Sequence, residues 1–405
     1  MMKRTALFSL CMLFAVNALK AQNFEQLLAQ GKSEFKSRQF ADAVTTLEKA
    51  VKLNPLNSEA HYFLGYSYDR LNSADADGIP NLSIDLTIKA SKEFETVNQL
   101  TPKYTGEFVI LDPYSKITAE WGSAAFKYLY HNKKDSAIWA LKQGKAKGGF
   151  SEFFMQFNRL NLEQCSKNAF LFLSGDNFTF YNLYLQLIEQ CRTDVKAIDV
   201  GMLGSKWYPA LLRQHFNVQF DRNDQEVDSI QRLAWSDSLI TIGNFTWTVQ
   251  PTLAGSYLDR KDVLFLSLLN KNGMIDQANF IGGYPDDDKL FLTELCLPYL
   301  DHDRVTVNPI ETNWDTILKD YKNFLYLSEY VNQNSKMEVL NFESIQIRTM
   351  YFVYMEHYNG DENNARKLMS MFNKHFKHYG HSFTNEDVHK FYMEVNALFT
   401  QNTKR

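Results

Sequence analysis

Several side chains that can bind a ligand lie at the ends of two apolar runs in the middle of the chain. They are Asp176, Asn177, Thr179, Asp199, Lys206 and Trp207. Carboxylate, amide and hydroxyl groups bind sugar hydroxyls or a cation, and an indole face stacks on the apolar face of a sugar. These residue types therefore predict a ligand pocket of the carbohydrate type, provided that the fold brings them together.

The surrounding pattern predicts how these residues are positioned. Ala169–Leu173 and Val195–Val200 are apolar runs, and an amphipathic stretch separates them. Strand, turn, helix and strand in this order form a βαβ unit, which implies a parallel pair of strands. Ligands of such sheets bind beyond the carboxyl ends of the strands. The candidate residues fall at that edge.

Each candidate residue also has a purely structural interpretation. Asn177 or Thr179 can accept hydrogen bonds from free N–H groups at a helix start, and Asp176 is favoured at the positive end of a helix. Asp199 can be a hydrogen-bonded group within the sheet edge, and Trp207 a buried core residue. The sequence leaves both interpretations open.

Other clusters of chemically active residues do not predict a metal or a cofactor. Asp286, Asp287 and Asp288 lack the alternating spacing of a calcium loop and suit the start of a helix. The motif His375, His378 and His381 is interrupted by Gly380 and lacks further ligands at a familiar spacing. Nucleophile elbows, phosphate-binding glycine loops and H-E-x-x-H are also missing from the sequence.

Two cysteines flank the predicted βαβ unit. Cys165 precedes the first strand and Cys191 follows the helix. A helix that runs back along its strand brings both positions to the same end of the unit, so a Cys165–Cys191 disulfide is geometrically allowed. The alternative is that both are small buried apolar residues.

Residues 1–21 resemble a secretory signal peptide. Lys3 and Arg4 precede the apolar segment Ala6–Val16, and Ala21 is a small residue at the expected cleavage point. The apolar segment is shorter than the ~20 residues that span a bilayer, although a retained anchor helix is the alternative. We therefore expect an exported protein, either periplasmic or at the cell surface.

The net charge of −4 and the lack of dense basic runs argue against nucleic acid as a partner. No later segment is apolar enough to cross a membrane, so we expect membrane contact only through a partner.

Residues 22–150 contain a repeated pattern. Small, large and proline positions recur at matching places in two copies: Gly31, Ala43, Leu47, Ala50 and Pro55, then Gly65, Ala90, Phe94, Val97 and Pro102. This resembles the tetratricopeptide repeat, in which small residues let two antiparallel helices approach closely. Residues 69–81 form a polar insertion in the second copy, and a weaker third copy runs from Trp121 to Gly144.

Such repeats imply a stack of helical hairpins with a concave groove. One interpretation is that the groove holds a peptide or helix of a protein partner. The other is that the repeats only brace the next domain. The chain is thus predicted to be multidomain, with N-terminal helical-hairpin repeats, a parallel-type α/β domain at 163–310 and C-terminal helical hairpins at 311–405.

The α/β domain is expected to continue beyond the βαβ unit. Residues 210–216 read as a helix, Val263–Leu269 is a third apolar run, and Val305–Val307 reads as a last short strand. In the tail, helical periodicity on both sides of Gly360-Asp361 resembles one more helical hairpin.

The stretch from Ser174 to Tyr208 carries a second resemblance. Its motif residues are Gly175, Asp176, Asn177, Thr179, Phe180, Leu183, Tyr184, Gln186, Arg192, Thr193, Asp194, Val195, Trp207 and Tyr208. They are similar, without a gap, to the soluble C-terminal part of a bacterial polytopic membrane family of the protein O-mannosyltransferase-like type. Phe178 and Tyr181 depart from that family's Asp and Pro, and its membrane-spanning part is missing from this sequence.

The resemblance implies a related soluble domain rather than a transferred glycosyltransferase activity. We therefore expect an exported, non-catalytic interaction or scaffold protein that binds a protein partner through its repeats. Its α/β domain would offer a ligand pocket for a glycan or glycopeptide. The alternative is an enzyme or accessory subunit of periplasmic protein glycosylation, with Asp176 and Asp199 as the pocket carboxylates.

Overall fold

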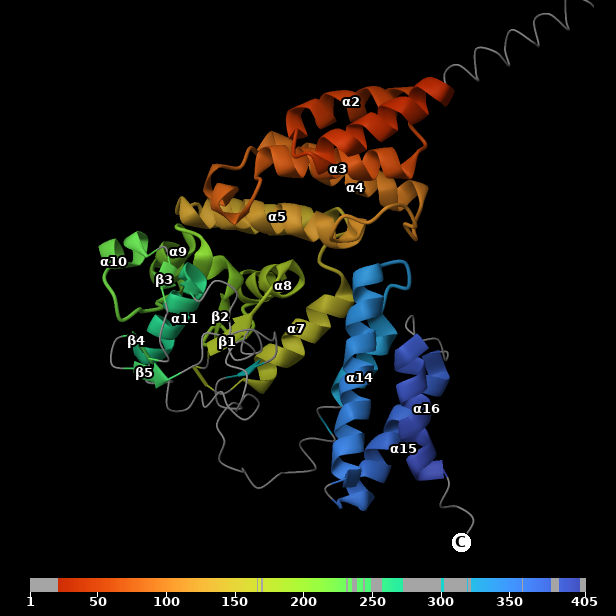
Figure 1. Ribbon diagram of the computed structural model, residues 1–405, viewed down its shortest axis with the longest axis vertical. Helices are drawn as coiled ribbons and strands as arrows, with labels where there is room; N and C mark the ends of the chain where they lie inside the picture. Colours follow the sequence, from red (N-terminus) through yellow and green to blue (C-terminus); the bar gives the residue numbers. More distant parts are fainter. Residues whose placement is uncertain are drawn as a thin grey trace, which may run out of the picture. The chain divides into compact units, whose positions relative to one another are not determined.

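The computed structural model describes residues 21–165, 167–168, 170–230, 232–234, 239–242, 245–248, 257–271, 300–301, 319, 322–358, 360–379 and 386–400 (Figure 1). The chain divides into two compact units, Met1–Gly149 and Phe150–Arg405. The first unit holds the repeats and the second holds the sheet and the C-terminal helices.

Helical hairpins build the first unit. Its helices are residues 21–36, α2 (Phe40–Leu53), α3 (Ser58–Asn72), α4 (Ile84–Leu100), α5 (Pro113–Tyr130) and α6 (Lys134–Ala146). They pair in chain order, α3 against α4 and α5 against α6, and neighbouring hairpins stack (Figure 1). The weak third copy is therefore a complete helical hairpin.

The close helix approach that the repeat pattern predicts is confirmed at two glycines. A Cβ added at Gly31 would lie 2.5 Å from Cγ of Leu47, and one added at Gly65 would lie 2.9 Å from Cζ of Phe94. Both distances are far below a normal van der Waals contact. In each hairpin the glycine of the first helix therefore leaves room for the large apolar residue of the second.

Local capping sets the helix starts. The side chain of Asn57 accepts a hydrogen bond from the backbone N–H of Ala60 at 2.8 Å, and Asp112 does the same for Ser115 at 2.8 Å. Pro113 occupies the first position of α5, where its missing N–H costs nothing. The insertion is partly helical, because α3 extends to Asn72 and residues 76–81 form the short 3₁₀ helix η1.

The predicted βαβ unit is confirmed in the second unit. Strand β1 (Phe170–Leu173) is followed by α8 (Asp176–Leu187) and by β2 (Lys196–Asp199), and the two strands are parallel. Leu173 lies opposite Asp199 at the carboxyl ends. Helix α7 (Glu152–Gln164) packs on α8 in this unit, so the expected boundary at residue 163 falls inside α7.

Beside the parallel β1–β2 pair, the sheet has a third strand that makes it mixed. Strand β7 (Leu300–Asp301) pairs with the other edge of β1 in the antiparallel direction. An antiparallel edge strand needs no helical crossover, and many α/β sheets carry one. The expected strand Val305–Val307 lies outside the described residues.

The third apolar run forms a helix. Val263–Leu269 lies within α11 (Arg260–Lys271), where Phe265 packs edge-on against Phe172 of β1 at 4.9 Å. A short apolar run does not by its periodicity distinguish a strand from a buried helix. The helix expected at residues 210–216 is confirmed as α9 (Tyr208–Phe216).

The described residues between α9 and α11 form short elements. They are α10 (Asp224–Ser229) and two antiparallel strand pairs, β3 (Arg232–Ala234) with β6 (Tyr257–Asp259) and β4 (Leu239–Ile242) with β5 (Phe245–Thr248). The 3₁₀ helix η2 (Gly201–Gly204) connects β2 to α9.

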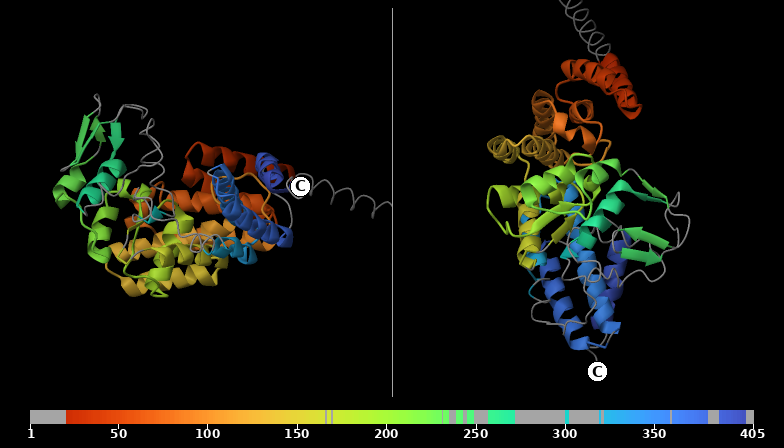
Figure 2. Two further views of the ribbon diagram at one scale, coloured as in Figure 1. Left: turned by 90° about the horizontal axis from the view of Figure 1, so that it is seen from below. Right: turned by 90° about the vertical axis from the view of Figure 1, so that its left-hand side faces the viewer.

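The last described helices are α14 (Lys336–Tyr358), α15 (Glu362–Tyr379) and α16 (Glu386–Thr400), and they pack against one another (Figures 1 and 2). The predicted break at Gly360-Asp361 separates α14 from α15. The three helices share a core with Leu325 of the preceding segment; their core residues are Met350, Val353, Ala365, Leu368, Met369, Phe372 and Val395. The predicted hairpin is therefore present and is completed by a third helix.

Among the described helices, none combines the length and the apolar character that a bilayer crossing requires. The described residues also contain no cluster of three or more His, Cys, Asp or Glu that could hold a metal ion. Asp286–Asp288 and His381 lie outside the described residues, as do the side chains of His375 and His378 and the signal-like residues 1–20.

Candidate functional site

Asp199 is buried at the carboxyl end of β2, with 3% of its surface exposed. Its carboxylate accepts hydrogen bonds from the backbone N–H of Gly175 at 3.3 Å and of Met202 at 2.9 Å, and from the hydroxyl of Thr179. The groups that hold it come from the β1–α8 turn, from α8 and from η2. Asp199 therefore ties the ends of the two parallel strands together.

The electrostatics of Asp199 follow from its burial. Removal from water raises the pKa of this carboxyl group, and the bonds from Thr179, Met202 and Gly175 oppose the rise. Its backbone N–H donates to the hydroxyl of Tyr208 at 2.9 Å. The arrangement matches the structural interpretation, a hydrogen-bonded group within the sheet edge.

The β1–α8 turn places three of the other five candidates at the start of α8. Gly175 precedes the helix with φ of 96°, a backbone conformation that favours glycine. Asp176 is half-buried at the first helical position, and Thr179 is buried and directed to Asp199. Asn177 is buried as well, and its Oδ1 atom has no hydrogen-bond partner. The turn thus brings Thr179 and Asp199 together.

Lys206 and Trp207 follow η2 but differ in exposure. Lys206 is exposed, whereas only 4% of Trp207 is exposed and its ring packs edge-on against Tyr208 at 5.5 Å. A buried indole has no open face on which a sugar could stack. The position of Trp207 therefore matches the core interpretation.

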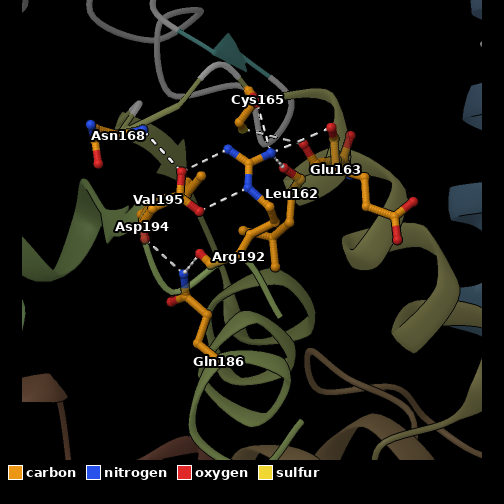
Figure 3. A network of polar contacts seen from close by, with 9 residues as sticks. Leu162, Glu163, Cys165, Asn168, Gln186, Arg192, Asp194 and Val195 are labelled. Atoms are coloured by element: carbon orange, nitrogen blue, oxygen red, sulfur yellow. Dashed lines mark hydrogen bonds and ion pairs between the residues drawn. The ribbon is translucent and has the colours of Figure 1, made fainter. Parts of the chain in front are cut away.

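Residues Arg192–Val195 form a polar network that the sequence did not predict (Figure 3). We call the hydrogen bonds and the ion pair of Arg192 and Asp194 the Arg192 latch. The guanidinium group of Arg192 donates to the carbonyl oxygens of Leu162 at 2.8 Å and Cys165 at 2.7 Å, at the end of α7. The same group forms a two-pronged ion pair with Asp194, at 2.8 and 2.9 Å. It therefore satisfies carbonyl groups that a helix end leaves unpaired.

Gln186 and Asp194 extend this latch (Figure 3). The Gln186 amide donates to the carbonyl oxygens of Arg192 at 3.0 Å and Val195 at 2.7 Å, and Asp194 accepts from the backbone N–H of Asn168 at 2.9 Å. Arg192 lowers the pKa of Asp194, mainly through their hydrogen bonds. The latch therefore joins the end of α7, the entrance to β1 and the entrance to β2.

A second buried polar network joins α7 to α8. Asn182 donates to Oδ1 of Asn158 at 2.8 Å, and Asn158 donates to the carbonyl oxygen of Asn177 at 3.1 Å. Both Asn158 and Asn182 are fully buried. The sequence alone does not predict this pair, because asparagines in a helical pattern usually point to solvent. It follows only once α7 and α8 are known to pack together.

Cys165 and Cys191 form no disulfide, so the allowed pairing is not made in this structure. Cys165 is buried and its thiol donates to the carbonyl oxygen of Asn161 at 3.3 Å. Cys191 is half-buried, and burial raises the pKa of its thiol. The buried-thiol alternative therefore describes Cys165.

The first unit carries a hollow of about 580 Å³, which we call the repeat groove. One face of the helix at residues 21–36 lines it together with Glu59 of α3 and Glu107 of the segment between α4 and α5. Lys32 Nζ lies 2.7 Å from both Glu59 and Glu107, and Lys36 Nζ lies 2.7 Å from Glu107. The first helices of two successive hairpins therefore share a charged hollow.

The two lysines of the groove stabilise the charged form of Glu107 but differ in exposure. Hydrogen bonds from Lys32 and then Lys36 lower the pKa of Glu107. The side chain of Lys36 is 58% exposed, whereas that of Lys32 is only 20% exposed and lies 4.9 Å from the ring centre of Phe63. The groove therefore combines a fixed lysine with one that is accessible to a partner.

Comparison with known proteins finds two family models that each match one part of the chain. A family model described as a tetratricopeptide repeat matches residues 28–78, and one described as TMEM260-associated domain 2 matches residues 155–219. No curated protein matches the chain. A solved structure, the P58(IPK) TPR domain, is 11% identical, with 94% of this chain and 99% of that one covered and a TM-score of 0.18.

These matches define two parts of the chain. The N-terminal part carries a tetratricopeptide-repeat match at residues 28–78, and the pairing of its helices agrees with that match. Residues 155–219, which include the Ser174–Tyr208 motifs and the Arg192 latch, match the TMEM260-associated domain. Tetratricopeptide repeats in general bind protein partners, which points to an interaction scaffold.

Proposed function

We propose that this protein is an exported, non-catalytic scaffold that binds a protein partner through its tetratricopeptide repeats. The observation that carries the proposal is the repeat groove, which lies where the first helices of two hairpins meet and exposes Lys36 beside Glu59 and Glu107. In stacked helical hairpins this concave side is the extended binding surface. The TMEM260-associated domain would then be the part that the repeats connect to the partner.

Site-specific photo-cross-linking tests this proposal. A photoreactive amino acid at Ser33, which is exposed and lines the groove, should trap the partner in cells that make the protein. The matched control places it at Lys49, an exposed residue of α2 outside the groove lining. The trapped protein is then purified and its affinity for the chain is measured with and without Lys36→Glu.

Two results decide the outcome. A partner that cross-links from Ser33 alone, and whose purified form binds more weakly to Lys36→Glu, supports the proposal. Equal cross-linking from both positions, or an affinity that Lys36→Glu does not change, contradicts binding in the groove. The alternative in which the repeats only brace the second unit would then be preferred.

The second candidate function is that of an accessory subunit in periplasmic protein glycosylation. It rests on the Ser174–Tyr208 resemblance, which falls inside the matched segment 155–219. The internal hydrogen bonds of Asp199 and the burial of Trp207 favour a non-catalytic role, and leave Asp176 and Lys206 as the accessible candidates.

A thermal-shift screen with sugars, sugar phosphates and short glycopeptides tests this second function. Stabilisation by one compound that disappears in Asp176→Ala would support a glycan pocket at the start of α8. A screen without any stabilising compound, in which Asp176→Ala lowers only the melting temperature, would contradict it.

Export is part of the main proposal and has its own measurement. If residues 1–21 are a signal peptide, the secreted protein should begin at Gln22. N-terminal sequencing of the protein in the periplasmic or surface fraction checks this. A protein that retains residues 1–21 would support the anchor-helix alternative instead.

A further inference from the structure

The segment between α4 and α5 lies along one face of α3. Glu59, Tyr62 and Tyr66 are spaced three and four residues apart, so they share that face. The side chains of all three contact residues 104–111. Glu59 accepts a hydrogen bond from the backbone N–H of Glu107 at 3.3 Å, and the hydroxyls of Tyr62 and Tyr66 bind the backbone of Leu111. We call residues 104–111 the strap.

The strap is held through its backbone at one end. The Tyr62 hydroxyl donates to the carbonyl oxygen of Leu111 at 2.9 Å and accepts from the N–H of Val109 at 3.0 Å. The Tyr66 hydroxyl donates to the same carbonyl at 3.0 Å and accepts from the N–H of Leu111 at 2.7 Å. Backbone contacts of this kind do not depend on the side chains that the bound segment carries.

Side chains of the strap supply specificity at its other end. The Tyr104 ring stacks on Tyr62, with ring centres 4.4 Å apart, and Phe108 lies 6.1 Å from Tyr62. Between these two aromatic residues, Glu107 pairs with Lys32 and Lys36 in the repeat groove. The strap therefore presents an aromatic residue, an acidic residue three positions later and a second aromatic residue directly after it.

Helix α3 is buried on the strap's side as well as on the sides that face α2 and α4. All residues from Ala60 to Tyr68 are buried, although one face of a helix in a stacked hairpin normally remains accessible. On this side, the hydroxyl groups of Tyr62 and Tyr66 and the ring of Tyr62 have the strap as their partner. Burial raises the pKa of both hydroxyl groups, so they stay protonated donors.

We propose that the strap is a built-in occupant of a peptide-binding groove, and that the partner is a protein with an extended segment of the same chemistry. That segment carries an acidic side chain for Lys32 and Lys36, flanked by aromatic residues for Tyr62, and it displaces the strap. This inference rests on the proposed function, because it names the kind of partner that the repeats bind.

The test supplies the strap as a separate peptide. A fluorescently labelled peptide with the sequence of residues 102–112 is titrated against the full-length chain and against a full-length variant in which residues 104–111 are replaced by eight Gly and Ser residues. Because a tethered competitor lowers the apparent affinity, we expect the variant to bind the peptide about tenfold or more tightly than the wild type. A peptide with Glu107→Lys should bind the variant weakly.

Further variants identify the contacts. Within the strap-replaced chain, Tyr62→Phe with Tyr66→Phe removes the hydroxyl groups but retains the rings, and it should weaken peptide binding. Circular dichroism establishes that each variant is folded. If the strap-replaced chain does not fold, Glu107→Lys in the intact chain takes its place. This change should speed hydrogen exchange at Val109 and Leu111 and raise the affinity for the peptide.

The opposite results would overturn the inference. A folded strap-replaced chain that does not bind the peptide, or that binds the Glu107→Lys peptide equally well, shows that the strap is only a connecting segment. The same holds if Glu107→Lys changes neither the exchange rates nor the affinity. In those cases cross-linking from Ser33 can still succeed, so the failure of this inference is distinct from that of the proposed function.

Discussion

Arg192 illustrates how a single side chain organises the second unit. It reaches carbonyl oxygens at the end of α7 while its own carboxylate partner, Asp194, holds the entrance to β1. A lysine has one charged centre and cannot donate in these directions at once. In the segment that matches the TMEM260-associated domain, these two residues therefore have a structural role.

We predict that Arg192→Lys lowers the free energy of unfolding of the second unit by about 2 kcal/mol, since charge-assisted hydrogen bonds are lost at a helix end. Chemical denaturation measures the change, and hydrogen exchange near Leu162 and Cys165 localises it. Arg159→Lys is the control, because Arg159 forms one partly exposed ion pair with Glu189 and should cost under about 1 kcal/mol. Equal effects of both changes would argue against the latch.

The stability of Asp199 variants tests whether this carboxylate has a structural role. Asp199→Ala leaves the N–H groups of Gly175 and Met202 without their acceptor, and should cost about 2–4 kcal/mol of stability. Asp176→Ala, at a half-exposed helix start, should cost about 1 kcal/mol or less. Thermal denaturation compares the two. A stable Asp199→Ala protein would show that the carboxylate does not hold the strand ends together.

Among the elements, the paired helices of the repeats depend on their glycines. Gly31→Ala places a methyl group against Leu47, so we predict a net loss of about 1–2 kcal/mol despite the better helix propensity of alanine. The loss should become smaller in a Leu47→Ala background, because the clash is then relieved. A double-mutant cycle from chemical denaturation measures this, and additive effects would contradict the close contact.

Helices α3 and α5 share a buried charged cluster. Lys116 of α5 lies 3.1 Å from Asp69 of α3 and 3.0 Å from Glu120 of its own helix. Burial raises the pKa of Glu120 to about 8, with Lys116 opposing the rise and Asp69 adding to it. The folded protein therefore holds a proton at Glu120 at pH values where the unfolded chain has released it.

This shift predicts how stability depends on pH. Because the pKa of Glu120 is raised above its ordinary 4.5, its contribution is fully present below pH 4.5 and is lost as the pH rises toward 8. Glu120→Gln keeps the shape without the charge, so its free energy of unfolding should decline less than that of the wild type over this interval. Denaturant titrations at several pH values measure the difference. Glu25→Gln, an exposed change, should follow the wild-type curve.

In the chain as a whole, the first unit is the part that we expect to fold by itself. In the first unit, Trp121 of α5 is buried and donates to Ser91 of α4 at 2.9 Å, so the third hairpin completes the core of the second. We predict that a fragment of residues 21–149 folds alone and melts cooperatively. A fragment of residues 21–112 should not, since arrays need about three repeats. Circular dichroism on heating separates these outcomes.

The sequence determined the regular elements of this protein. The spacing of Gly31 and Leu47 and of Gly65 and Phe94, and the order of apolar runs around residues 169–200, predicted helical hairpins and a parallel strand pair that the structure contains. Such patterns are local, because helix and strand periods recur within a few residues. The same reasoning did not decide the structure of α11, because a short apolar run suits either a strand or a buried helix.

Which polar groups meet depends on contacts between residues that are far apart in the sequence. Arg192 and Leu162 are 30 residues apart, and Tyr62 and Leu111 are 49 apart, yet each pair is joined by a hydrogen bond. Asp199, which sequence reasoning placed in a pocket or a sheet edge, is enclosed by donors from three separate elements. No local period encodes such contacts, since they depend on how packed elements exclude water and leave buried groups to satisfy one another.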